Sequence, residues 1–232
     1  MRKLTVLLII AAIVLSFAAC TSKSNTDIRG EQIGGAISET DTSSTESEES
    51  SEQEFSLGSN DGAKYESKFL GLGCTLPEGW TFYDDAKIRE LNKSTMDLAG
   101  DEYAELMKDA QVVYDMFASD AQGVNNVNVA LEKVDRLQLA ALDIKKNYDN
   151  LVPTLKQSFE NMGYTDIQYE IAEVTVDGKK YPALNFTAKI GDAVMYQTSI
   201  SKKCNGYLAS IAITTYNENT VSDILGKFYH IK

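Results

Sequence analysis

The last third of the chain alternates apolar and polar residues in four runs that are separated by two-residue turns. Asp177-Gly178 and Asn205-Gly206 are strong hairpin signals, because these residues tolerate the positive φ that tight turns need. Gly191-Asp192 supplies the remaining turn. The pattern predicts an antiparallel meander of four strands. The predicted strands cover residues 167–176, 180–190, 193–203 and 207–216.

Alternation also predicts three strands before the meander, over residues 67–76, 111–119 and 126–134. Pro77-Glu78-Gly79 ends the first of them. Val112, Tyr114 and Met116 fall on one face of the second strand. The turn 120–123, which contains Gly123, joins the second strand to the third, so we expect these two to form a hairpin.

Apolar residues at three- to four-residue spacing predict helices. The clearest helical run covers residues 141–162 and stops at Gly163. Pro153 lies inside this run, and a proline removes one helical hydrogen bond, so we expect a kink or two abutting helices. Further helical patterns begin at the caps Asp84-Asp85 and Asp101.

The chain ends in one more helical pattern, for which Asn219 is the expected cap. Val221, Ile224, Leu225 and Phe228 share its apolar face. Hairpin-linked strands with helices before and after them are typical of the α+β class. We therefore predict an antiparallel sheet of about six to seven strands, flanked by helices.

Three short motifs accompany this order of elements: Pro77-Glu78-Gly79-Trp80, Asn126-Val127-Asn128-Val129, and Val176-Asp177-Gly178 followed by Tyr181-Pro182-Ala183. With them, residues 64–232 resemble the PsbP-like fold, which the extrinsic photosystem II protein shares with many bacterial lipoproteins. The resemblance implies a binding or accessory role and no catalytic motif. The basic docking residues of the plant protein have no identifiable counterpart here, so its photosynthetic role is not carried over.

The first twenty residues are different in character. Arg2 and Lys3 precede an almost continuous apolar run, which ends in Phe17-Ala18-Ala19-Cys20. This is the layout of a secretory signal, and it resembles the lipobox of bacterial lipoproteins. The resemblance implies cleavage after residue 19, lipidation of Cys20, and attachment to the extracytoplasmic face of the cell membrane. A plain signal peptide with an incidental cysteine is the alternative.

Composition separates a tether from a folded domain. Residues 21–63 hold ten acids and two bases among many Ser, Thr and Gly residues. Such a segment buries too little apolar surface to offset its ordering entropy. The sequence predicts a signal peptide over 1–19, a disordered tether over 20–63 and one domain over 64–232. That domain carries 18 bases and 24 acids, which argues against a nucleic-acid partner.

Candidate chemistry is sparse. The only histidine, His230, lies two residues from the end with no carboxylate beside it in the sequence, so a surface position is expected. No nucleophile, phosphate-binding or dinucleotide motif is present, and no ligand spacing indicates a metal or a cofactor. Cys74 and Cys204 are compatible with a disulfide in an exported compartment or with two separate buried thiols.

Aromatic residues remain as candidates for a partner surface. Trp80 and Tyr83 follow the first predicted strand, and tyrosines recur through the meander. Packing explains most such residues, but tyrosine is also enriched in interface hot spots. Three functions stay open: a tethered module that binds an envelope protein, a small-ligand or solute-binding lipoprotein, and an envelope hydrolase. We expect the first, without catalysis.

Overall fold

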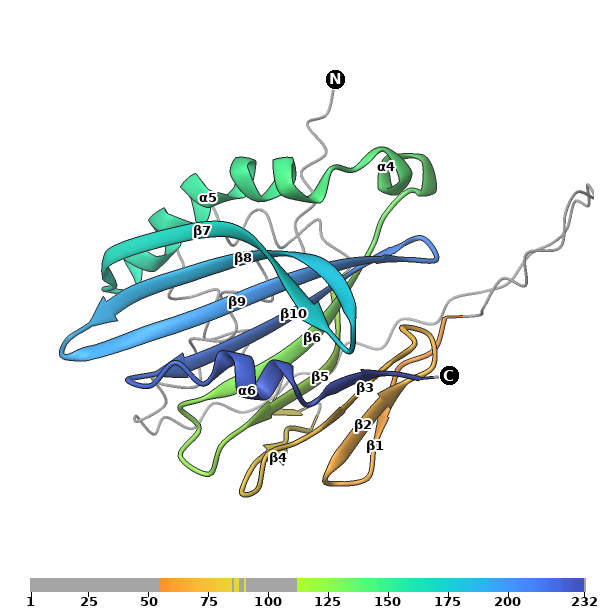
Figure 1. Ribbon diagram of the computed structural model, residues 1–232, viewed down its shortest axis with the longest axis horizontal. Helices are drawn as coiled ribbons and strands as arrows, with labels where there is room; N and C mark the ends of the chain where they lie inside the picture. The colour runs from red at the N-terminus through yellow and green to blue at the C-terminus, as the bar shows by residue number, and fades with distance from the viewer. Residues whose placement is uncertain (1–54, 85, 88–89, 91–111, 232) are drawn as a thin grey trace, which may run out of the picture.

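The computed structural model describes residues 55–84, 86–87, 90 and 112–231. The elements bounded within these residues are antiparallel strands in two sheets and three helices, which confirms the α+β class (Figure 1). The helical patterns predicted between Asp84 and residue 110 fall largely outside the described residues. None of the helices in the described ranges is long and apolar enough to cross a membrane.

The larger sheet has seven strands in the order β4-β5-β6-β10-β9-β8-β7. Their bounds are β4 Thr81–Phe82, β5 Val112–Ser119, β6 Asn126–Lys133, β7 Thr165–Val176, β8 Lys179–Ile190, β9 Ala193–Cys204 and β10 Tyr207–Tyr216. The predicted meander and the β5–β6 hairpin are both confirmed. Asp177 and Gly178 have φ of 44° and 78°, as a type I′ turn requires.

The smaller sheet has four strands in the order β1-β2-β3-β11. Their bounds are β1 Ser59–Asn60, β2 Lys64–Ser67, β3 Leu72–Thr75 and β11 Phe228–His230. The single strand predicted over 67–76 is wrong, because a turn closed by the Gly71 amide and the Lys68 carbonyl separates β2 from β3. Phe228 was expected in the last helix and instead pairs with Cys74 in this sheet.

Glycine at position 73 has a packing reason. A methyl group added there would overlap the ring of Tyr229 in the neighbouring strand β11. Glycine at this position therefore lets β11 approach β3 closely.

The helices are α4 (Arg136–Ala141), α5 (Ile144–Asn161) and α6 (Val221–Leu225). Asp135 and Asp143 cap α4 and α5 through their side chains, so the predicted long helix is broken before Ile144 and not at Pro153. Pro153 lies inside a continuous α5. Helix α6 begins after Thr220, not after the expected cap Asn219.

Two apolar cores lie on the two faces of the larger sheet. Helix α5 lies over β7 and β8 (Figure 1). The helix-side core between them has Tyr148, Leu155, Phe159 and Phe186 as large members. The small-sheet core joins the opposite face to β2, β3, β11 and α6. Each face of the larger sheet is therefore covered by a different layer.

A β-bulge in β5 connects the two sheets. The pairing with β6 shifts between Tyr114 and Met116, which leaves Asp115 outside the ladder. The shift puts Met116 into the small-sheet core, whereas Tyr114 packs against the helix-side core, so the prediction that both share one face is wrong. The Asp115 carboxylate accepts hydrogen bonds from Gly58 N at 2.5 Å and from the Tyr65 hydroxyl at 2.7 Å.

Candidate interaction site

Strand β7 forms one edge of the larger sheet. Among the described strands it pairs only with β8. It is twelve residues long, and Val176 is its only buried residue. Tyr169 is 49% exposed, and its ring centroid lies 6.3 Å from that of Phe186, its register partner in β8. A strand at the edge of a sheet presents backbone groups that another chain can pair with.

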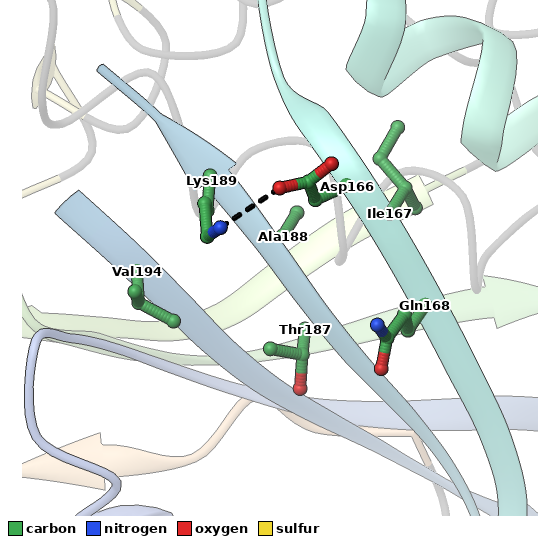
Figure 2. Close-up of a pocket in the computed structure, with 7 residues that line it drawn as sticks. All are labelled: Asp166, Ile167, Gln168, Thr187, Ala188, Lys189 and Val194. Atoms are coloured by element: carbon green, nitrogen blue, oxygen red, sulfur yellow. Dashed lines mark hydrogen bonds and ion pairs between the residues drawn. The ribbon is translucent and has the colours of Figure 1, made fainter. Parts of the chain in front are cut away.

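A shallow pocket of about 350 Å³ opens at the start of β7 (Figure 2). A break in register between Thr165 and Gln168 forms its rim, and Asp166 there has a φ of 53°. Bulges often occur at sheet edges, where they turn a side chain out of the ladder. The pocket is lined by Asp166, Ile167, Gln168, Thr187, Ala188, Lys189 and Val194.

One ion pair dominates the chemistry of this pocket. Lys189 Nζ lies 2.8 Å from Asp166 Oδ2, and Figure 2 shows the two side chains directed toward each other across the strands. The hydrogen bond to Asp166 raises the pKa of Lys189. Both side chains are more than half exposed, so the pair contributes little stability. The pocket offers a cation, a carboxylate, an amide and a hydroxyl to whatever contacts it.

His230 has a carboxylate partner that sequence reasoning missed. Its Nε2 lies 2.9 Å from the Tyr181 hydroxyl, and its Nδ1 lies 3.4 Å from Asp177 Oδ2. The same carboxylate accepts the backbone N–H of His230 at 2.8 Å, which lowers the pKa of Asp177. The His230 side chain is only 13% exposed, so the predicted surface position is wrong. The array fastens β11 to the β7–β8 turn.

Polar residues also line the helix-side face of the central strands, where they bond across strands. Gln197 Nε2 donates to Thr214 Oγ1 at 2.7 Å, and the hydroxyls of Ser199 and Ser210 lie 3.2 Å apart. The Tyr148 hydroxyl donates from α5 to Ser201 Oγ at 3.1 Å. Buried polar groups satisfied in this way fix strand register and helix position.

The two aromatic candidates are largely packed. Trp80 is partly buried against the small-sheet core. The Tyr83 hydroxyl accepts a hydrogen bond from Ser119 Oγ at 2.9 Å, its ring lies 4.7 Å from that of Phe117, and Lys87 Nζ lies over it at 3.8 Å. Both therefore present less free surface than Tyr169, which alternation alone does not distinguish from the other tyrosines of the meander.

The two cysteines of the folded part are free thiols, and Cys20 lies outside the described residues. Burial raises the pKa of Cys74 to about 12, so this thiol stays protonated. The Cys204 thiol donates to the Phe69 carbonyl at 3.1 Å, and burial raises its pKa too. Within the described ranges no group of three or more His, Cys, Asp or Glu side chains is placed to hold a metal ion.

Comparison with known proteins gives little more. No family model matches the chain, and no curated protein matches it. Among solved structures, it is similar to LpqN, which is involved in cell envelope biogenesis of Mycobacterium tuberculosis, with a TM-score of 0.36 and 8% identity over 75% of this chain and 87% of that chain.

Proposed function

We propose that this protein is a non-catalytic interaction module, held by a lipid on Cys20 to the extracytoplasmic face of the cell membrane. The leader with its terminal Ala-Ala-Cys supports the anchor. The composition of residues 21–54 supports a tether between anchor and domain. The PsbP-like resemblance of residues 64–232 belongs to the same proposal. A tether of this kind raises the effective concentration of the domain for partners near the membrane.

The position of β7 at the edge of the larger sheet, among the strands that the structure describes, is the observation that carries the interaction role. Twelve residues in extended conformation lie at the end of the sheet, with Tyr169 exposed among them. Strand addition at such an edge gives affinity through the main chain and specificity through alternate side chains. Tyr169 and the pocket around Gln168 and Lys189 would contact the side chains of the added strand and select among them.

Site-specific photo-crosslinking tests the edge. A benzoylphenylalanine in place of Tyr169 should give a discrete adduct with an envelope protein in intact cells. The same group at the exposed loop residue Glu218 is the matched control. Once the partner is identified, Tyr169→Ala should weaken its binding by about 1–2 kcal/mol, as a moderate hot spot does. Absence of an adduct at 169, or the same adducts at both positions, would argue against this role.

The anchor has a separate test. Cys20→Ser removes the only atom that a lipobox can acylate, so the variant should be released from membranes or stay unprocessed. Membrane fractionation compares it with the parent, and Cys204→Ser controls for loss of a thiol. A Cys20→Ser protein that is processed and sediments with membranes as fully as the parent would overturn the lipid anchor.

The pocket favours one alternative, a small-ligand or solute-binding lipoprotein. Its volume of about 350 Å³ lies near the lower limit of known ligand sites. Native mass spectrometry of the purified protein distinguishes the two functions. A small molecule that is bound to the parent and lost from Thr187→Trp would favour ligand binding over the interaction module.

A further inference from the structure

Four of the five large exposed apolar side chains in the described structure gather at one end of the domain. They are Phe55, Leu57, Val113 and Leu137, with exposed fractions of 38%, 54%, 37% and 82%. The fifth, Tyr169, lies on the β7 edge. Exposed apolar residues scattered singly need no explanation, but a gathered set marks a contact surface.

Contacts of these residues and of their chain neighbours place all four at the end of the larger sheet where β10 begins. The ring of Phe55 stacks on that of Tyr207 at 4.7 Å, where β10 begins. The hydrogen bond from Gly58 N to Asp115 places Leu57 beside the stretch of β5 that holds Val113.

Helix α4 belongs to the same end. Tyr207 lies opposite Lys133 at the end of β6, and the next residue, Val134, donates its N–H to the Gly206 carbonyl at 2.9 Å. Leu137 follows in the first turn of α4. We call the surface formed by Phe55, Leu57, Val113 and Leu137 the apolar end.

Basic side chains border the apolar end. Lys133 and Lys203 are exposed there, and Lys203 Nζ reaches the carbonyl of Ala140 in α4 at 3.2 Å. The side chain of Arg136 lies against Gly206 in the β9–β10 turn. Acids lie at this end too, but Asp135 accepts two amides at the start of α4, and Asp115 accepts hydrogen bonds from Gly58 and Tyr65. Glu132, before Lys133, is buried in β6. This end therefore combines cations and apolar groups in a domain that is acidic as a whole.

The chain reaches Cys20 from this same end. Phe55 belongs to the apolar end and is the first described residue, so only residues 21–54 separate it from the proposed lipid anchor. As a coil these residues would span roughly 30 Å. The surface closest along the chain to the anchor is thus the one that carries the exposed leucines, a phenylalanine and the lysines.

We propose that the apolar end docks on the bilayer surface. This inference rests on the proposed anchor at Cys20. Leucine and phenylalanine side chains would enter the boundary between headgroups and acyl chains, while Lys133, Arg136 and Lys203 would meet lipid phosphates. The net negative charge of the domain repels anionic lipid. Salt screens this repulsion beyond a Debye length of roughly 8 Å. At contact, therefore, the attraction between the local cations and the lipid phosphates outweighs it. The ladder aligns Tyr169 with Phe186, Gln197 and Thr214, and Thr214 lies seven residues along β10 from Tyr207, so docking by the apolar end keeps Tyr169 away from the lipid.

Tryptophan quenching in reconstituted vesicles tests the orientation. The full lipidated protein is placed in phosphatidylcholine–phosphatidylglycerol vesicles with brominated acyl chains, and Leu137→Trp is compared with Tyr169→Trp. After subtraction of the parent signal from Trp80, the tryptophan at 137 should lose at least about half of its fluorescence and shift to shorter wavelength, as an interfacial side chain would. The tryptophan at 169 should change little.

Three outcomes would contradict the inference, and the third of them would also contradict the proposed lipid anchor. Equal quenching at 137 and 169, or none at 137 in protein that floats with the vesicles, refutes docking by this end and is also the result expected if it binds a protein or a second copy. A parent protein that does not float with vesicles would overturn the anchor itself, and docking with it.

Charge variants give a second, independent readout. Lys133→Glu and Lys203→Glu should each reduce quenching at position 137 in phosphatidylglycerol-containing vesicles. Lys227→Glu changes the net charge equally at an exposed position near Thr75, away from the apolar end, and should have no effect. Equal loss with all three variants would show that net charge alone governs the contact, which would contradict docking by the basic border.

Discussion

At the scale of single residues, Asp115 is the group whose environment departs most from what the sequence indicates. In the sequence it lies within an alternating strand pattern, where an acidic residue is typical of an exposed position. The bulge turns it inward, where burial raises the pKa of its carboxyl above 3.8, although the bonds from Tyr65 and Gly58 act in the opposite direction. Nothing local in the sequence announces a bulge, since the extra residue is defined by its pairing with β6.

This environment predicts a pH dependence of stability. Because the folded-state pKa of Asp115 is higher than the unfolded one, the folded state binds this proton more tightly. Its contribution to the free energy of unfolding is therefore largest below the ordinary pKa and decreases as pH rises through the raised value. Asp115→Asn keeps an acceptor for Gly58 and can donate to the Tyr65 oxygen, so it should remove this decrease.

Urea unfolding of parent and variant at a series of pH values, from the acidic range to neutrality, measures the effect. The difference in unfolding free energy, parent minus Asp115→Asn, should fall with rising pH. Exposed acids with lowered pKa, such as Glu66 and Asp177, act in the opposite direction but cancel in that difference. A difference that is constant or rises with pH would contradict the assignment.

At the scale of elements, turn chemistry made the meander predictable. Asp177-Gly178 and Asn205-Gly206 specify their hairpins through two residues each, and the observed positive φ values match that chemistry. The smaller sheet was not predictable in the same way, because β11 pairs with β3 across almost the whole folded chain. Which strand lies at an edge also depends on such distant pairings, and for that reason Tyr169 did not stand out from other tyrosines.

The break predicted at Pro153 is wrong for a different reason, because α5 continues through this proline. Pro153 is exposed on a helix whose opposite face is held by Tyr148, Leu155 and Phe159. Tertiary packing thus overrides the local preference. The proline still withholds one backbone hydrogen bond from the helix.

Replacement of this proline should therefore be stabilising. Pro153→Ala restores an N–H within α5 and touches no core contact, so we expect the free energy of unfolding to rise by about 1–3 kcal/mol. Chemical denaturation measures it, with Asn150→Ala on the exposed face of the same helix as the control for alanine propensity. An unchanged or lower stability for Pro153→Ala would mean that α5 is adapted to its proline.

At the scale of the whole molecule, the sequence and the structure place the start of the domain differently. Composition predicts a tether as far as residue 63, yet Phe55 already contacts Phe69 and Tyr207, and β1 lies within the predicted tether. Acidic and hydroxyl residues dominate the averaged composition of residues 21–63, so two apolar residues near its end carry little weight in it. Their partners are distant in sequence, and only the fold reveals them.

Limited proteolysis tests where the protected domain begins. Composition predicts fast cleavage within residues 21–54, whereas the contacts of Phe55 predict a stable fragment that starts close to it. Mass spectrometry of the fragments from Glu-specific cleavage locates the boundary. Protection of residues 46–54 in the parent would contradict the predicted tether, and rapid cleavage at Glu66 would contradict the packing of the first strands.

The pairing of β11 with β3 also sets an order for biosynthesis. A ribosome makes β3 early and β11 after every other strand of the described chain, so the smaller sheet stays incomplete until the larger one has been translated. Until then, the apolar face that this sheet covers stays exposed on the nascent polypeptide, like the apolar surfaces that chaperones bind. A protein that reaches its native state only after its last strand appears is well suited to being handed, still unfolded, to an export machinery.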